Sequence, residues 1–226
     1  PLLEKKILKP RLALVMDSTE FDAVIAQKGL IHARVQIFGK AAHGAYNWRG
    51  INAVEIAAEV ITMLKQFKYK YKKHPLLREP TMNIGVIAGG HKVNMVADFC
   101  EFTMDLRFLP GTDSKQLLGL IKGCIQKITK KFKIIIDDIQ APYEVDKNNI
   151  FVKSYIDLVK KLGNKAQVKG SEGATVITFF QKYRIPAFAT GYAAHGTAHT
   201  SDEYIKVNDL FIVTQLLESY LKKYDT

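Results

Sequence analysis

Cysteine is scarce in this sequence, with two residues among 226. This number excludes a disulfide-stapled scaffold and fits a reducing compartment, so we expect a cytoplasmic protein. No apolar run reaches the roughly 18 residues that span a bilayer. Neither a secretory signal peptide nor a phosphate-cradling glycine motif is recognisable. The sequence therefore predicts no membrane partner and gives no sign of a nucleotide-binding loop.

Acidic residues are also few relative to basic ones. The chain has 33 Lys and Arg against 22 Asp and Glu, a formal net charge of +11. Such a balance suits an acidic partner and keeps an RNA-binding module among the alternatives. Apolar residues make up 47% and charged residues 24%, which excludes a disordered or fibrous chain. The length allows one large domain or two small ones.

The stretch from residue 30 to residue 140 alternates between strand and helix patterns. Apolar residues recur with a period of two in the strand patterns and at helical spacing in the helix patterns. The expected elements are strands at 30–38, 81–88, 99–109 and 133–139 and helices whose apolar residues lie at 53–64 and 117–128. Either Asp113 or Ser114 can cap the second helix. The order of the elements is β-α-β-β-α-β, which is typical of a ferredoxin-like α/β sandwich with one open sheet face.

The flanking segments suggest a second α/β layer structure. Their expected elements are strands at 12–16, 23–26 and 187–189 and helices at 150–162 and 207–224. Strands that alternate with helices favour a parallel sheet covered on both faces, here interrupted by the ferredoxin-like insertion. The domains expected are 1–29 and 142–226, which together make an incomplete αβα domain, and 30–141.

Candidate chemical residues lie in loops that follow strands. His195 and His199 are four apart, but the glycines around them predict a loop after the strand at 187–189, where open α/β sheets place their sites. Asp17 follows an apolar strand in the same way. His43 follows the strand at 30–38 and suits a general acid or an oxyanion donor. Taken singly, each is better explained as an ordinary turn, cap or solvent-facing loop residue.

Two further residues suit the binding of a carboxylate. Arg107 offers a bidentate guanidinium fork, and Asn94 offers an amide donor. Arg107 is equally compatible with a solvated or ion-paired position on a strand face. Cys100 and Cys124 fall in strand and helix patterns and are expected to be small buried hydrophobes.

Four segments, taken in order, are more specific than any single residue. They are 39–45 (GKAAHGA) with 49–55 (RGINAVE), 80–90 (PTMNIGVIAGG) with Asn94, 104–111 (MDLRFLPG), and 191–204, which ends in HTSDEY. This series resembles the acetylornithine deacetylase, succinyl-diaminopimelate desuccinylase and carboxypeptidase family of di-metal amidohydrolases. The resemblance covers nearly the whole chain.

The resemblance implies a fold, a metal site and an assembly. Residues 30–141 would be a ferredoxin-like lid domain that also carries the contacts of a homodimer. The flanking segments would be part of a zinc-peptidase-like αβα catalytic domain. Asp17 and His199 would each be a ligand to one of two zinc ions, with cobalt as the alternative metal.

The resemblance also implies roles in binding and catalysis. His43 would reach across the dimer to stabilise the oxyanion. Asn94, Arg107 and the loop around Gly173 would bind the substrate, an N-acyl amino acid or a short peptide. Residues 16–18 (MDS) stand where the family has Gly-Glu-Pro, and the loop at 171–175 lacks the family's Thr-Asp or Thr-Glu. The second departure bears on the acyl and side-chain specificity.

The resemblance further implies that metal ligands are missing. The family carries an H-x-D motif, a bridging aspartate and a Glu-Glu pair before the position of Asp17, and this sequence has none of them. One carboxylate and one imidazole are too few for two zinc ions. We therefore expect the chain, which opens at Pro1, to be the C-terminal part of a hydrolase and to be inactive alone.

Two alternatives to a hydrolase stay open at this point. One is a non-catalytic dimerisation or regulatory module that kept the lid and lost the chemistry. The other is a basic ferredoxin-like RNA-binding module, which the acidic residues Glu101 and Asp105 on the third strand disfavour. We expect no nucleic-acid partner.

Overall fold

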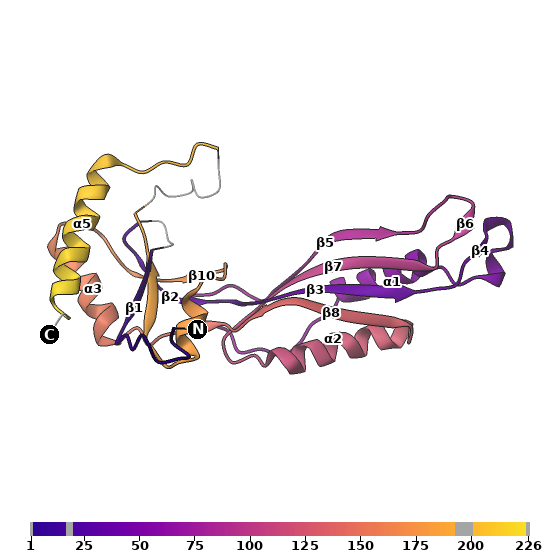
Figure 1. Cartoon of the computed structure of the whole chain (residues 1–226), viewed down its shortest axis with the longest axis horizontal. Coiled ribbons are helices and arrows are strands. Elements are labelled where there is room, and N and C mark those ends of the chain that lie inside the picture. The colour runs from indigo at the N-terminus through magenta and orange to yellow at the C-terminus, as the bar shows by residue number, and fades with distance from the viewer. Residues whose placement is uncertain (1, 17–19, 193–200, 225–226) are drawn as a thin grey trace. The chain divides into compact units, whose positions relative to one another are not determined.

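The computed structural model describes residues 2–16, 20–192 and 201–224, and these fall into two compact units (Figure 1). The first, the discontinuous unit, comprises residues 1–28, 75–77 and 142–226. The second, the central unit, comprises residues 29–74 and 78–141. Each unit has its own hydrophobic core.

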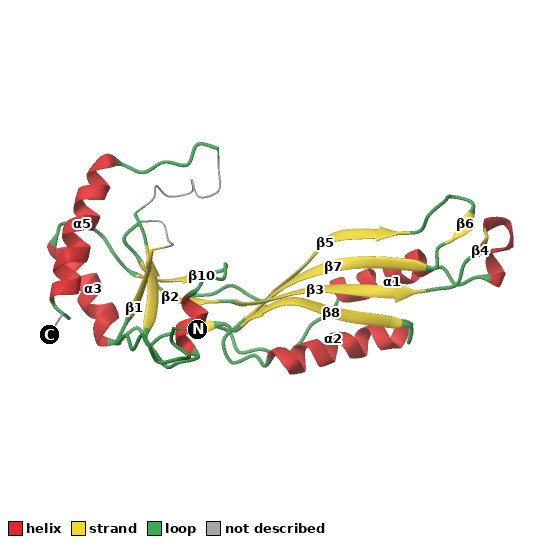
Figure 2. Ribbon diagram, in the orientation of Figure 1, coloured by secondary structure: helices red, strands yellow, loops and turns green. Residues whose placement is uncertain are grey.

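The central unit is a four-stranded antiparallel sheet with two helices on one face (Figure 2). Its main elements are β3 (Gly29–Phe38), α1 (Ala53–Lys65), β5 (Thr81–Gly89), β7 (Phe99–Phe108), α2 (Ser114–Ile128) and β8 (Phe132–Gln140). The strand order is β5-β7-β3-β8. The expected β-α-β-β-α-β order and the α/β fold class are confirmed.

Period-two alternation explains how this sheet acquires one buried face. Along β7 every second residue, from Cys100 to Phe108, is buried, and the residues between them are more exposed. The buried residues pack with Val35 and Ile37 of β3 against Val60 of α1 and other apolar helix residues. Since side chains alternate across a strand, the polar residues of β7 are left on the opposite, open face.

Both helices of the central unit begin at a side-chain cap. The carboxylate of Asp113 accepts hydrogen bonds from the backbone N–H groups of Lys115 and Gln116, and Asn52 caps α1 in the same way. Such caps satisfy backbone donors that the first helical turn leaves unpaired. Asp113, rather than Ser114, is therefore the capping residue of α2.

The discontinuous unit is a mixed sheet. Its strands are β1 (Ala13–Met16), β2 (Ala23–Gln27), β9 (Tyr143–Glu144), β10 (Val168–Ser171) and β11 (Ala187–Thr190). β1 pairs with β11 and β10 with β2 in parallel, but β2 is antiparallel to β11 and β9. The expectation of a wholly parallel sheet is therefore wrong. Only six residues separate β1 from β2, and a parallel crossover needs about a dozen or more.

Helices cover both faces of this sheet. They are α3 (Ile150–Lys161), α4 (Ile177–Gln181) and α5 (Val207–Lys222). In β2, Ala23 and Ile25 pack into a cluster that includes Tyr155 of α3 and Tyr220 of α5. Val24, between them, packs into a second cluster with Ile177 of α4 and Tyr143. All five residues of β2 are buried, so this strand lies between two layers of helix.

One strand overlaps residues 170–173 (GSEG), whose composition predicts a loop. Gly170 and Ser171 belong to β10, which pairs with β2. A Cβ atom on Gly170 would lie 2.2 Å from the carbonyl oxygen of Leu76, so the close backbone approach requires glycine here. Gly170 thus serves tight packing inside a sheet rather than a turn.

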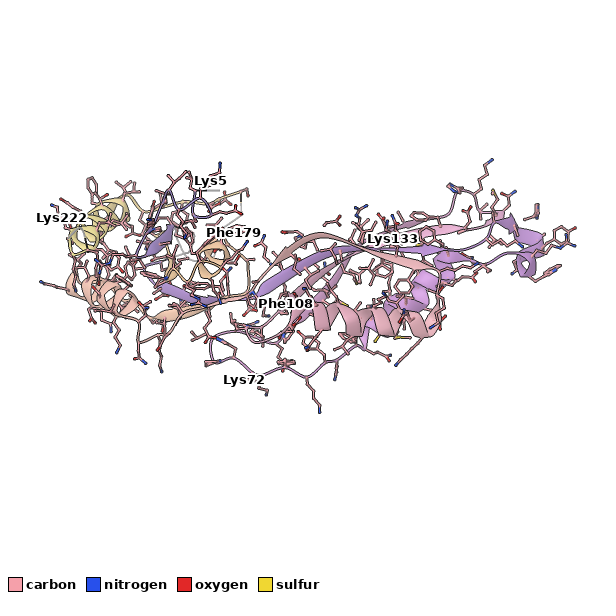
Figure 3. The ribbon with its side chains drawn as sticks, turned by 60° about the horizontal axis from the view of Figure 1, so that its bottom comes forward. Lys5, Lys72, Phe108, Lys133, Phe179 and Lys222 are labelled. Atoms are coloured by element: carbon pink, nitrogen blue, oxygen red, sulfur yellow. The ribbon has the colours of Figure 1, made fainter. Side chains whose placement is uncertain are left out.

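Exposed lysine side chains contribute to the excess positive charge. Lys72, Lys133 and Lys222, labelled in Figure 3, are all exposed. No helix within the described residues is long and apolar enough to cross a membrane.

The packing of β7 gives a first test of the fold. Phe102 is fully buried in the central core, whereas Phe38, on the neighbouring strand, is 40% exposed. We expect Phe102→Ala to lower the free energy of unfolding by about 3–5 kcal/mol, because it leaves a cavity in a close-packed core. Phe38→Ala should cost about 1 kcal/mol or less. Urea denaturation followed by circular dichroism measures both, and equal losses would contradict this assignment of the core.

Candidate functional site

The candidate residues His43 and Asn94 lie together at one end of the central unit. His43 ends the short strand β4 (Ala42–His43), which pairs with β6 (Met95–Val96). The backbone N–H of Gly44 donates a 2.8 Å hydrogen bond to the carbonyl oxygen of Asn94. Figure 1 shows β4 and β6 side by side beyond the Phe38 end of β3. Both candidate side chains are exposed.

The loop that carries His43 is closed by its own backbone. The backbones of Lys40 and Ile51 exchange two hydrogen bonds of 2.8 and 2.9 Å. These bonds close residues 40–51 into a loop, the tip loop. Gly39 precedes it, and a Cβ atom there would lie 2.2 Å from the carbonyl oxygen of Ile51. The glycines of the GKAAHG segment thus serve close backbone contacts, which is a physical reason for their place in the motif.

The imidazole of His43 caps a short 3₁₀ turn, η1 (Gly44–Arg49). Its Nδ1 atom accepts a 3.1 Å hydrogen bond from the backbone N–H of Ala45. The ring of Tyr46 packs against the imidazole at a centroid distance of 5.8 Å. Tyr46 in turn contacts Trp48 edge-on at 5.6 Å and lies under the guanidinium of Arg49 at 5.1 Å. The imidazole is therefore ordered by its neighbours although it is exposed.

Arg107 lies at the other end of the same strand system. In the antiparallel register Phe99 faces Phe38 and Phe108 faces Gly29. Arg107 is eight residues beyond Phe99 along β7 (107 − 99 = 8), or about 26 Å at 3.3 Å per residue. One copy of the chain therefore does not bring Arg107 and the His43–Asn94 pair to the same small ligand.

The guanidinium of Arg107 is already engaged by a carboxylate. Its Nε and Nη2 atoms donate to the two oxygens of Asp105 at 2.7 and 2.9 Å. This hydrogen bonding, more than the electrostatic attraction of Arg107 and His32, holds the pKa of Asp105 below its ordinary value, against the effect of burial. His32 lies 3.5 Å from the same carboxylate. The remaining N–H groups of Arg107 are the ones left for another anion.

The loop around Gly173 is anchored to the end of β2 in the discontinuous unit. The side chain of Gln27 exchanges three hydrogen bonds of 2.9 to 3.3 Å with Thr175. The ammonium of Lys28, whose side chain is only 2% exposed, lies 2.5 Å from Glu172. Ser171 Oγ accepts a hydrogen bond from the N–H of Gly173 itself. The loop is thus fixed on both sides of Gly173.

The sequence reasoning missed Gln27 and Lys28 as anchors of this loop. A signal was present, since these two polar residues follow directly on the apolar run of β2, at the end of a buried strand. A buried charge needs a partner, so a lysine at the end of a buried strand indicates an acidic residue nearby, here Glu172. Tyr46 was missed as well, because its contact with His43 depends on the shape of the tip loop.

The two expected metal ligands, Asp17 and His199, lie outside the described residues. Within 2–16, 20–192 and 201–224 no three His, Cys, Asp or Glu side chains gather to hold a metal ion. A catalytic zinc takes three protein ligands and a water. One carboxylate and one imidazole by themselves therefore do not fit a complete zinc site.

Comparison with known proteins identifies the class of the central unit. Residues 25–133 match the family model described as a peptidase dimerisation domain. The chain is 28% identical over 228 residues to an acetylornithine deacetylase of Photorhabdus laumondii, covering 94% of this chain and 57% of that protein. The region that the model matches is therefore a peptidase dimerisation domain. The chain as a whole is similar to a deacetylase, which agrees with the family that its motifs resemble.

Solved structures of an aminopeptidase and a carboxypeptidase share the fold of this chain. The aminopeptidase PepT of Bacillus cereus matches 98% of this chain with a TM-score of 0.80 at 19% identity. The M20 family metallo-carboxypeptidase Sso-CP2 of Sulfolobus solfataricus matches 97% with a TM-score of 0.76 at 18% identity. The chain covers 59% and 65% of these proteins. It therefore spans about three-fifths of the length of the relatives it matches.

The Asp105–Arg107 pair predicts a specific pH dependence. Because the folded pKa of Asp105 lies below its ordinary value of 3.8, the pair stabilises the fold above that pH. The contribution is lost as the pH falls through the lower, folded value. We expect Asp105→Asn to destabilise the chain at neutral pH and to have little effect near about pH 2. Urea denaturation at several pH values measures this difference.

Arg107→Met provides the matched background for this experiment. If Arg107 causes the shift, Asp105→Asn should have no pH-dependent effect on stability in the Arg107→Met chain. A pH dependence that persists in this background would assign the shift to other groups, His32 first among them.

Proposed function

We propose that this chain is the lid-bearing part of a metal-dependent amidohydrolase that cleaves the amide bond of an N-acyl amino acid or a short peptide. The names of its relatives, a deacetylase, an aminopeptidase and a metallo-carboxypeptidase, support this reaction class. Asp17 and His199 are the proposed zinc ligands, with cobalt as the alternative. The other ligands and the general base would come from the part of such a protein that this chain does not span.

Each remaining candidate has a role that its chemistry supports. A metal held by Asp17, His199 and the further ligands would supply Lewis-acid chemistry to the amide carbonyl. His43 donates a hydrogen bond to the oxygen on which negative charge develops, and Asn94, beside it, donates to the substrate. Arg107 binds the free carboxylate of the substrate through the N–H groups that Asp105 does not occupy. The anchored loop around Gly173 supplies a rigid wall for the acyl group or side chain.

The observation that carries this proposal is the separation of about 26 Å along β7 between the His43 end and Arg107. Two copies of the chain, related by a two-fold axis, would bring the tip loop of one copy to the Arg107 end of the other. A composite site of this kind needs a homodimer. The peptidase dimerisation domain, residues 25–133, is where we place its interface.

The edge strand β5 is the surface proposed for this interface. β5 carries no charged residue and exposes Val86 by 60% and Ile87 by 49%. The opposite edge, β8, carries Lys133, Asp137 and Asp138. Charged residues on an edge strand discourage pairing with another sheet, and an uncharged edge with exposed apolar residues favours it.

A charge on β5 tests the interface. We expect Val86→Lys to raise the dissociation constant of the dimer roughly 100-fold or more, because two-fold symmetry places the new charge in the interface twice. Ile136→Lys, at a 40% exposed position on β8, is the matched control and should leave the dimer intact. Sedimentation equilibrium of the 226-residue chain measures both. The reverse pattern would move the interface to β8.

Complementation between variants tests the composite site, in a form of the protein that includes the remaining metal ligands. His43→Ala and Arg107→Ala should each abolish hydrolysis of N-acetyl amino acids. After the two variants are dissociated, mixed equally and reassociated, half of the dimers hold one intact site, so roughly a quarter of the wild-type activity should return. No recovery would mean that both residues serve one site from the same copy.

The 226-residue chain without those ligands should hydrolyse none of these substrates. Hydrolysis by this chain alone would falsify the proposed division of the active site.

A further inference from the structure

We infer that the tip loop holds His43 as its Nε2–H tautomer, through the backbone N–H of Ala45, and that Tyr46 is the positioning residue that orients the imidazole. The inference rests on the proposed function for its catalytic meaning. The tautomer itself follows from the geometry of residues 43–49.

The tautomer follows from the hydrogen bond to Nδ1. In a neutral imidazole one ring nitrogen donates and the other accepts. The N–H of Ala45 points at Nδ1 over 3.1 Å, so Nδ1 must supply the lone pair and the proton must sit on Nε2. With a proton on Nδ1, two N–H groups would face each other. No described residue is hydrogen-bonded to Nε2, which is therefore the donor available to a ligand.

The local sequence explains why this bond forms. A 3₁₀ turn leaves its first backbone N–H groups without internal partners, and a side chain at the N-cap position commonly accepts one of them. His43 is the N-cap of η1, with extended φ and ψ of −66° and 132°. Its ring nitrogen takes the place that a serine or aspartate oxygen usually fills. The same hydrogen bond thus caps the turn and selects the tautomer.

Tyr46 fixes the direction in which Nε2–H points. The hydrogen bond to Nδ1 leaves the ring free to tilt, and the ring of Tyr46 contacts one side of it at an interplanar angle of 54°. The turn is broken at Tyr46, whose φ and ψ of −124° and 45° are not helical. Trp48 contacts the Tyr46 ring in a T-shaped arrangement, and the guanidinium of Arg49 lies over the face of the Tyr46 ring. An aromatic side chain held in this way orients its neighbour without touching a substrate.

The tautomer decides between the two roles that the sequence leaves open for His43. A general acid needs the doubly protonated ring, and a proton on Nδ1 breaks the bond to Ala45. A hydrogen-bond donor to an oxyanion needs only the neutral Nε2–H form, which the tip loop already holds. The geometry is thus compatible with the oxyanion role proposed for His43 and argues against a general acid.

Nuclear magnetic resonance of the ¹⁵N-labelled 226-residue chain tests the tautomer without any need for activity. We expect a coupling across the hydrogen bond between the Ala45 amide nitrogen and His43 Nδ1, together with a protonated-type shift for Nε2. Ala45→Pro removes the N–H and should abolish the coupling, whereas Ala45→Ser keeps the N–H and the coupling. A protonated Nδ1, or no coupling in the unaltered chain, overturns the inference.

Enzyme kinetics in the form with complete metal ligands tests the positioning role. We expect Tyr46→Ala to lower kcat about tenfold with little change in KM, because the lost orientation affects a bond made in the transition state. Tyr46→Phe keeps the ring and should restore kcat. Equal activity of the two variants overturns the role of Tyr46. If His43→Ala is fully active, the proposed function fails, and the coupling still decides the tautomer.

Discussion

The ten-residue antiparallel pairing of β3 with β7 is the constraint on which the rest of the central unit depends. It runs from Gly29 opposite Phe108 to Phe38 opposite Phe99 without a register shift. This register buries alternate residues of both strands under α1 and α2. A slip by one residue would turn every one of those side chains to the open face. The same register separates the tip loop from Arg107 by most of the length of a strand.

Close backbone contacts shape the two ends of this strand pair. At the β3 start, a Cβ atom on Gly29 would lie 2.5 Å from the ring of Phe108, labelled in Figure 3, so that ring packs over bare backbone. At the other end Gly39 and Gly44 allow the tip loop to fold back on Ile51 and Asn94. Glycine therefore stands where two backbone segments come into close contact, and His43 lies in one of these segments, the tip loop.

On the open face of the sheet, arginine side chains that could bind an anionic ligand already form ion pairs with aspartates. Arg107 binds Asp105 two residues away on its own strand, and Arg34 binds Asp137 across strands at 2.9 Å. Period-two alternation places residues 105 and 107 on one face, so this pair follows from the sequence once the strand is assigned. The sequence does not reveal that Asp105 occupies only one edge of the Arg107 guanidinium, which leaves the other edge for a ligand.

Local patterns in the sequence determined most of the elements of this protein and the α/β class of its fold. Alternation, helical spacing and the Asp113 cap act over a few residues, and the strands and helices they predict are present. The mixed sheet and β10 were missed, since strand direction and the fit of Gly170 against Leu76 depend on distant segments.

The candidate site divides in the same way. The motifs selected His43, Asn94 and Arg107, but only the tertiary structure places the first two together and the third at the far end of β7. It also decided the bond from Ala45 to the imidazole and the contacts of Gln27 and Lys28 with the loop around Gly173. The physical reason is range: periodicity and capping are properties of neighbouring residues, whereas a site is made by chain segments that meet only after the sheet has closed.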